Sequence, residues 1–145
     1  MENTAEIHSF ISKSLIKHMN TEKNRDQHFI ERAIELSKKG MDSGKGGPFG
    51  CIVVKGDEII GEGSNEVTSL NDPTAHAEVV AIRNACEKLG TYQLTDCEIY
   101  TSCEPCPMCL GAIYWSRPKR VVYANTKEEA AAIDIKNLVK FDAIK

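Results

Sequence analysis

Three cysteines and two prolines stand within the nine residues TSCEPCPMC (101–109). A proline inside a helix costs about 3 kcal/mol, whereas a proline in the first turn removes a donor that had no partner anyway. A helix over residues 105–116 must therefore hold both prolines in its first turn. This places Cys106 at the N-terminal end of the helix, where backbone N–H groups and the helix dipole favour a thiolate. Cys109 follows on the same face, so the two sulfurs can bind one ion.

A histidine and a glutamate two residues apart occur upstream, in NDPTAHAEV (71–79). Residues with this spacing do not face each other within a helix, so His76 and Glu78 can serve one site only from a first turn. Thr74 and Asp72 are both candidate N-cap residues for a helix that starts here. Two helix N-termini can then converge on one Zn²⁺ ion, which predicts His76, Cys106 and Cys109 as its ligands.

Three protein ligands are typical of catalytic zinc sites, which keep a position for water, whereas structural sites have four. Glu78 is the carboxylate left to move protons, and H-x-E followed by P-C-x-x-C is the signature of zinc-dependent base deaminases. An iron–sulfur cluster run would need a further cysteine at position 113, which is isoleucine. A redox C-x-x-C would not need the histidine and the glutamate. Cys103 is therefore expected to be a buried thiol, or one that contacts the ligands, and not itself a ligand.

Short strands alternate with helices along the middle of the chain. Residues 51–55 and 58–63 flank Gly56-Asp57, which is a hairpin signal. Further strands are predicted at 97–101 and 120–124, with helices at 76–90 and 105–116. This order indicates an α/β fold with three layers, in which a mixed sheet opens with an antiparallel hairpin and carries helices on both faces. Cys51, Cys86 and Cys97 are expected to be core residues.

Apolar residues recur at helical spacing over 5–19 and again over 28–41, with the polar stretch NTEKNRD (20–26) between them. We expect two helices here, and a division of the chain into an appended N-terminal helix (1–22) and a deaminase domain (23–145). The glycine-rich stretch at 44–50 follows a helix and precedes a strand, the reverse of nucleotide-binding fingerprints, so we interpret it as a connection.

The overall charge limits the partners. Eighteen basic and 21 acidic residues give a net charge of −3, which disfavours nucleic acid as a partner and favours a small molecule. No apolar run is long enough to cross a membrane, and the N-terminus lacks the pattern of a secretory signal. A cytoplasmic location is expected, where the six cysteines would stay reduced.

The chain resembles the cytidine deaminase superfamily over residues 28–135, and within it the bacterial guanine deaminases. The stretches that carry the resemblance are GGPFG (46–50), NEVTSLNDPTAHAEV (65–79), TSCEPCPMCLGAIYW (101–115) and the adjoining RPKRVVYA. The resemblance implies that Asn65 contacts the base, that the Ala77 backbone N–H reaches a substrate carbonyl, and that Phe49 and Trp115 line or close the pocket. It also implies one Zn²⁺ per chain, a homodimer, and hydrolysis of guanine to xanthine and ammonia in purine catabolism.

Two kinds of alternative remain open at this point. The same chemistry could act on tRNA adenosine, cytosine or guanosine, and a different class of protein, a non-catalytic interaction module stabilised by zinc, would carry similar ligands. In guanine deaminases a C-terminal tail helps to cap the substrate, whereas here the chain is shorter and has Lys136 and Asn137 near the place of an acidic residue. The N-terminal helix is one candidate for that cap.

Overall fold

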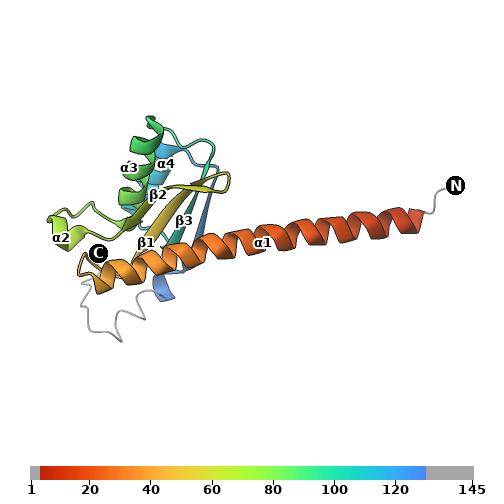
Figure 1. Cartoon of the computed structure of the whole chain (residues 1–145), viewed down its shortest axis with the longest axis horizontal. Coiled ribbons are helices and arrows are strands. Elements are labelled where there is room, and N and C mark those ends of the chain that lie inside the picture. The colour runs from red at the N-terminus through yellow and green to blue at the C-terminus, as the bar shows by residue number, and fades with distance from the viewer. Residues whose placement is uncertain (1–3, 130–145) are drawn as a thin grey trace.

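A computed structural model describes the backbone of residues 4–129 and the side chains of residues 21–129. A long helix is followed by a small sheet with shorter helices (Figure 1). The elements are α1 (Thr4–Asp42), β1 (Gly50–Lys55), β2 (Glu58–Ser64), α2 (Val67–Leu70), α3 (Ala77–Leu89), β3 (Cys97–Cys103), α4 (Pro107–Ser116) and β4 (Arg120–Asn125).

The four strands of the described residues form one mixed sheet in the order β2-β1-β3-β4. β1 pairs antiparallel with β2 and with β3, and β3 pairs parallel with β4. Gly56, with φ of 62°, makes the tight turn between β1 and β2 that its sequence predicts. β1 and β3 are therefore the central strands, each hydrogen-bonded on both sides.

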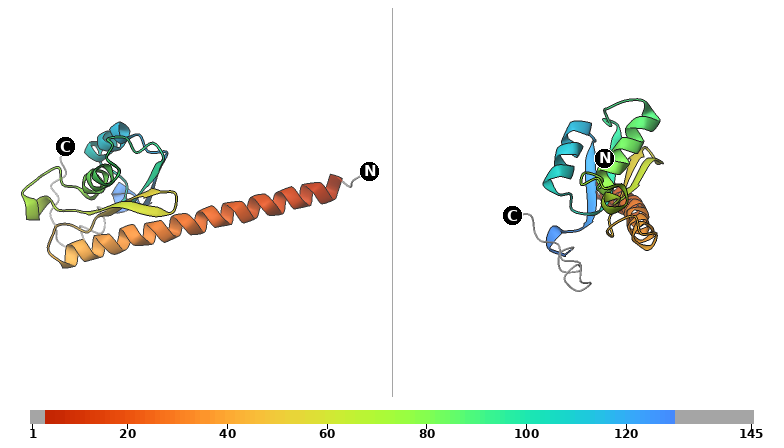
Figure 2. Two further views of the ribbon diagram at one scale, coloured as in Figure 1. Left: turned by 45° about the horizontal axis from the view of Figure 1, so that its top comes forward. Right: turned by 90° about the vertical axis from the view of Figure 1, so that its left-hand side faces the viewer.

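Side chains of the central strands alternate between two apolar clusters. Cys51, Val53 and Ile99 pack under α3 and α4 on one face, whereas Ile52 and Tyr100 pack under α1 on the other. The two further views show α1 on the opposite side of the sheet from α3 and α4 (Figure 2). The predicted three-layer α/β fold is confirmed, and α1 is not placed to cap the predicted site within its own chain.

The break that the polar stretch 20–26 predicted is wrong, because α1 is one continuous helix of 39 residues. No glycine or proline lies in this stretch, and two of its polar side chains, Arg25 and Asp26, have partners on the sheet. Arg25 donates hydrogen bonds to Glu98 at 3.1 Å and to the Tyr100 hydroxyl at 2.9 Å. Asp26 accepts a hydrogen bond from Tyr100 at 2.8 Å and pairs with Arg120. The polar residues Arg25 and Asp26 therefore belong to a helix face that contacts charged and polar side chains of the sheet, and they do not indicate a loop.

Two glycines of β2 let α3 lie directly against the sheet. A Cβ atom at Gly63 would come within 2.4 Å of the Ala77 carbonyl oxygen, and one at Gly61 within 2.5 Å of the Ala81 carbonyl oxygen. On the helix side the contact is made by Ala77, Ala81 and Ala85, all fully buried. Small residues on both elements therefore set the position of the first turn of α3.

The division into an N-terminal helix (1–22) and a domain (23–145) stays a prediction. Lys136 and Asn137 lie outside the described residues. The glycine-rich stretch joins α1 to β1, as predicted. Among the described helices, none is long and apolar enough to cross a membrane.

Candidate metal centre and catalytic site

The first site element is the N-terminus of α3. The N-cap residue is His76, in extended conformation with ψ of 155°, and not Thr74 or Asp72 as predicted. The Asp72 carboxylate accepts hydrogen bonds from the backbone N–H and hydroxyl of Thr74, at 2.8 and 2.7 Å, and forms a turn before the helix. Glu78 consequently occupies the first helical turn, as its spacing from His76 required.

The second site element is the N-terminus of α4. Pro107 is the first helical residue and Cys106 is the N-cap. Pro105 lies before the helix, so the prediction that both prolines belong to its first turn is wrong for Pro105. An N-cap residue has non-helical backbone angles, and Cys106 has ψ of 169°, which turns its side chain out of the helix. Cys109, one turn on, is fully buried.

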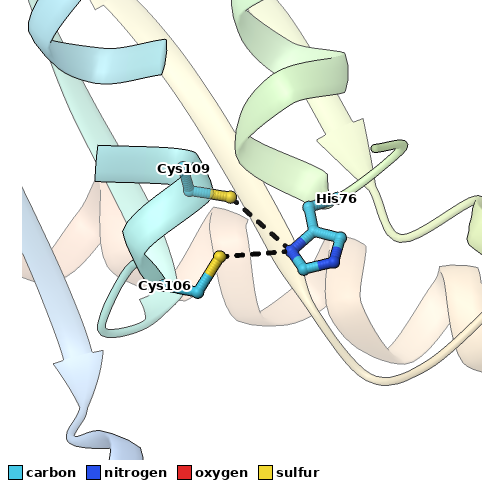
Figure 3. A group of neighbouring side chains, drawn as sticks. All are labelled: His76, Cys106 and Cys109. Carbon is cyan, nitrogen blue, oxygen red and sulfur yellow. Dashed lines mark hydrogen bonds between the residues drawn. The ribbon is translucent and has the colours of Figure 1, made fainter. Parts of the chain in front are cut away.

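The two helix starts bring His76, Cys106 and Cys109 together (Figure 3). Their potential ligand atoms lie within 4.8 Å of one another. His76 Nδ1 is 3.6 Å from each of the two sulfurs. Zn²⁺ bonds of about 2.0–2.1 Å to nitrogen and 2.3 Å to sulfur, at a tetrahedral angle, separate two ligand atoms by about 3.5 Å. The donor set and its spacing therefore fit one zinc ion.

Glu78 adjoins this group and is almost completely buried, with 6% of its surface exposed. Its two carboxylate oxygens have different neighbours. Oε1 accepts a hydrogen bond from the Thr101 hydroxyl at 2.9 Å, and Oε2 lies 3.3 Å from Cys109 Sγ. The carboxylate is thus beside the ligand group without belonging to it.

Burial and the neighbouring Glu78 carboxylate raise the pKa of the Cys109 thiol well above its ordinary value. A metal must therefore displace a proton from this thiol when it binds. Burial, with a smaller contribution from Glu78, also raises the pKa of Cys103 to about 11. Cys103 is half-buried, with its sulfur 3.9 Å from the Thr126 carbonyl oxygen, and lies outside the ligand group.

The residues predicted to contact substrate come from two helices and from the segments that flank β1 and β2. Asn65 is buried directly after β2, and its side-chain oxygen accepts a hydrogen bond from the Val67 backbone N–H at 3.1 Å. Ala77 is the first residue of α3, where backbone N–H groups have no acceptor within the helix. Phe49 precedes β1 and packs against the core. Trp115 is 71% exposed, and its ring contacts Tyr114 and Arg117.

One residue of the site was not predicted from the sequence. Thr101 is fully buried in β3 and is the hydrogen-bond donor to Glu78. It lies two residues before the C-E-P-C-P-M-C run in the sequence, but a threonine in a strand is ordinarily a packing residue. The partner lies 23 positions away in the chain, so no local pattern joins the two.

Residues 23–125 match the family model of the cytidine and deoxycytidylate deaminase zinc-binding region. The chain belongs to this family of zinc-dependent deaminases. Among the side chains that the structure describes, His76, Cys106 and Cys109 form the only group of three or more His, Cys, Asp or Glu residues whose ligand atoms are close enough to hold one metal ion.

Within the family the chain is similar to several curated proteins. It is 63% identical over 103 residues to the guanine deaminase of Bacillus subtilis, an alignment that covers 71% of this chain and 66% of the relative. It is 39% identical over 114 residues to the tRNA-specific adenosine deaminase of Aquifex aeolicus, covering 78% and 75%. The chain thus spans about two thirds of the length of the guanine deaminase that it matches.

Solved structures of guanine deaminases share the fold. The X-ray structure of the Bacillus subtilis enzyme superimposes with a TM-score of 0.73 at 61% identity and covers 74% of this chain and 68% of that one. A guanine deaminase from Nitrosomonas europaea gives a TM-score of 0.68 at 34% identity and covers 72% and 61%.

Proposed function

We propose that the protein hydrolyses the exocyclic amine of guanine, producing xanthine and ammonia. The observation that carries this proposal is the pairing of a three-residue ligand group with a buried carboxylate that is not a member of it. A structural zinc site has four protein ligands, so a group of three beside a free carboxylate suits hydrolysis better than a non-catalytic role.

The roles of the four residues follow from their positions. His76, Cys106 and Cys109 would hold Zn²⁺, which supplies Lewis-acid activation of a water molecule. Glu78 would take one proton from that water and deliver it to the ring nitrogen next to the carbon that bears the amine. It would then carry the second proton, from the hydroxyl group formed at that carbon, to the amine, which leaves as ammonia while the carbonyl forms. In guanine this carbon is C2. Burial of Glu78 keeps bulk water from competing for the proton.

Four further residues would bind the base. We assign Asn65 and the Ala77 backbone N–H to its polar edge. Ala77 begins α3, and the residue after Asn65, Glu66, donates its backbone N–H to the carbonyl oxygen of Ala75, two residues before that start. Phe49, at the start of β1, would line the pocket. Trp115 would contribute an aromatic wall, although its ring stands outward on α4 in a single chain.

Guanine is favoured over a tRNA adenosine by the degree of similarity. Identity to the Bacillus subtilis guanine deaminase is 63%, against 35–41% for the bacterial tRNA-specific adenosine deaminases. The net charge of −3 also disfavours a nucleic-acid substrate. The protein would then act on a free base in purine catabolism, in the cytoplasm.

We also propose that the protein works as a homodimer. Leu110, Tyr114 and Trp115 place apolar surface on the outer side of α4, with exposed fractions of 48, 60 and 71%. Exposed apolar patches of this kind are typical of protein interfaces. Light scattering on the purified protein should give twice the chain mass of 16.0 kDa.

The decisive experiment measures ammonia release from guanine, guanosine, cytosine, cytidine, adenine and a tRNA anticodon stem. We expect turnover of guanine alone. Turnover of the tRNA stem alone would overturn the assignment of the substrate, and no turnover of any of the six would favour the interaction module.

A further inference from the structure

Thr101 is placed to fix the carboxylate of Glu78. Its hydroxyl has two oxygen acceptors in reach, the Glu78 Oε1 atom at 2.9 Å and the Gly50 carbonyl oxygen at 3.4 Å, and it also contacts the Cys51 sulfur, which is a weak acceptor. A hydroxyl has one proton, and bonds between a hydroxyl and an oxygen acceptor are usually 2.7–2.8 Å long. The shorter contact, to a carboxylate, is therefore the stronger bond, and the hydroxyl is committed to Glu78.

Within the part of the chain whose side chains the structure describes, the carboxylate has no equally strong hydrogen bond on its other side. Oε2 faces Cys109 Sγ at 3.3 Å, and a thiol is a weak donor. The two oxygens are therefore distinguished by their surroundings. Oε1 is held from the sheet, whereas Oε2 lies on the side of the ligand group, where the reaction would take place.

The strand that carries Thr101 is suited to hold a side chain still. Thr101 pairs with Cys51 of β1 and with Tyr123 of β4, so β3 is hydrogen-bonded on both sides at this position. A β-branched side chain has few χ1 choices, and Thr101 is 99% buried, since only 1% of its surface is exposed. Catalytic groups work best when such rigid, packed neighbours fix their rotamers.

We propose that Thr101 is a positioning residue for the proposed deamination, which keeps Glu78 Oε1 occupied and leaves Oε2 alone to transfer protons. This inference rests on the proposed function. A threonine that served packing alone would leave the carboxylate free to rotate, and either oxygen could then carry the proton.

The test compares Thr101→Val, which keeps the shape and removes the hydroxyl, with Thr101→Ser, which keeps the hydroxyl. Each variant is loaded with one equivalent of zinc, and kcat and KM for guanine are measured. Because misplacing a catalytic group by about 1 Å can cost about a hundredfold in rate, we expect kcat of Thr101→Val to fall about 10- to 100-fold with KM within about threefold. Thr101→Ser should recover kcat to within about threefold. If the valine variant does not fold, Thr101→Ala replaces it with the same expectations.

Ser116→Ala is the matched control, because Ser116 is also a buried hydroxyl but bonds only the Ile113 carbonyl oxygen of its own helix. This variant should lower the melting temperature, and it should not show the selective loss of kcat, with KM nearly unchanged, that is expected of Thr101→Val. A value of kcat for Thr101→Val within about twofold of the parent, or a serine variant no better than valine, would overturn the proposal.

Crystal structures of the zinc-loaded parent and of Thr101→Val give a readout that does not depend on turnover. We expect one Glu78 rotamer in the parent, and a rotated or split carboxylate in the variant. An unmoved carboxylate in the variant would refute the positioning role. A parent that releases no ammonia from guanine would instead refute the proposed function, and the two structures would still decide the role of Thr101.

Discussion

Replacing Gly63 by alanine tests whether close contact between β2 and α3 positions the site. The new Cβ atom would lie 2.4 Å from the Ala77 carbonyl oxygen and 2.6 Å from the Ala81 backbone nitrogen. An ordinary contact begins at 3.4 Å, so α3 must move away from the strand by about 1 Å. Both atoms belong to backbone, and a rotamer change cannot relieve the overlap.

The displacement would act on the ligand group directly. Ala77 stands between His76 and Glu78, so a shift of about 1 Å at Ala77 moves both relative to the cysteines on α4. We expect overpacking to cost about 1–3 kcal/mol of folding free energy. We expect kcat for guanine to fall by about two orders of magnitude, because a misplacement of 1 Å can cost that much.

Gly61→Ala provides the control with a matched steric change. Its Cβ atom would lie 2.5 Å from the Ala81 carbonyl oxygen, one turn further from the ligands. Both variants should therefore melt at lower temperatures by similar amounts, as measured by calorimetry. Only Gly63→Ala should show weakened zinc binding in a chelator competition and a large loss of kcat.

Equal activities in the two variants would show that the position of the first turn of α3 does not depend on this contact. A Gly63→Ala variant with the kcat and zinc affinity of the parent would refute the reasoning altogether.

Three other predictions concern the zinc ion, proton transfer by Glu78, and the charged network, in which Arg25, Asp26, Glu98 and Arg120 surround the Tyr100 hydroxyl. Glu78→Gln should retain one zinc per chain by elemental analysis and lose at least about a hundredfold in turnover, and retained turnover would exclude its proton-transfer role. Chelation should abolish ammonia release while circular dichroism still shows a folded chain, whereas a zinc-stabilised module would unfold at the same chelator concentration. Despite burial, hydrogen bonds from Arg120, Tyr100 and Arg25 lower the pKa of Glu98 below 4.5. A carboxylate with a lowered folded-state pKa stabilises the fold above its unfolded pKa, and this contribution is lost as pH falls through the folded value. Glu98→Gln should therefore cost about 1–3 kcal/mol at pH 7 and show a shallower loss of melting temperature below about pH 4.5, and an unchanged acid slope would contradict this.

Local rules were sufficient to predict the ligand group. Proline placement indicated the start of α4 to within two residues, and the two-residue spacing of His76 and Glu78 indicated a first turn, because each rule involves only residues close in sequence. The predicted N-cap of α3 was wrong because the same kind of local rule could not tell a helix cap from a turn before the helix. Asp72 and Thr74 have side chains that cap helices, but they bond each other instead.

Long-range partners explain what the sequence did not predict. The polar residues of 20–26 suggested a loop, since nothing local shows that Arg25 and Asp26 meet Glu98 and Tyr100 more than 70 positions away. The face of α1 was also only partly predicted. The helical spacing of apolar residues over 28–41 predicts one buried face that includes Phe29, Ala33, Ile34 and Met41. Phe29 and Ala33 are buried, but Ile34 and Met41 are exposed.

Adjacent residues of β3 serve opposite sides of the sheet. The Tyr100 hydroxyl joins the charged network under α1, and the Thr101 hydroxyl bonds Glu78 under α3. An insertion or deletion of a single residue in this strand would turn each side chain to the other face. The hydrogen bonds of Tyr100 to α1 and that of Thr101 to Glu78 would then be lost together. Length variation among relatives of this chain should accordingly be confined to segments outside β3.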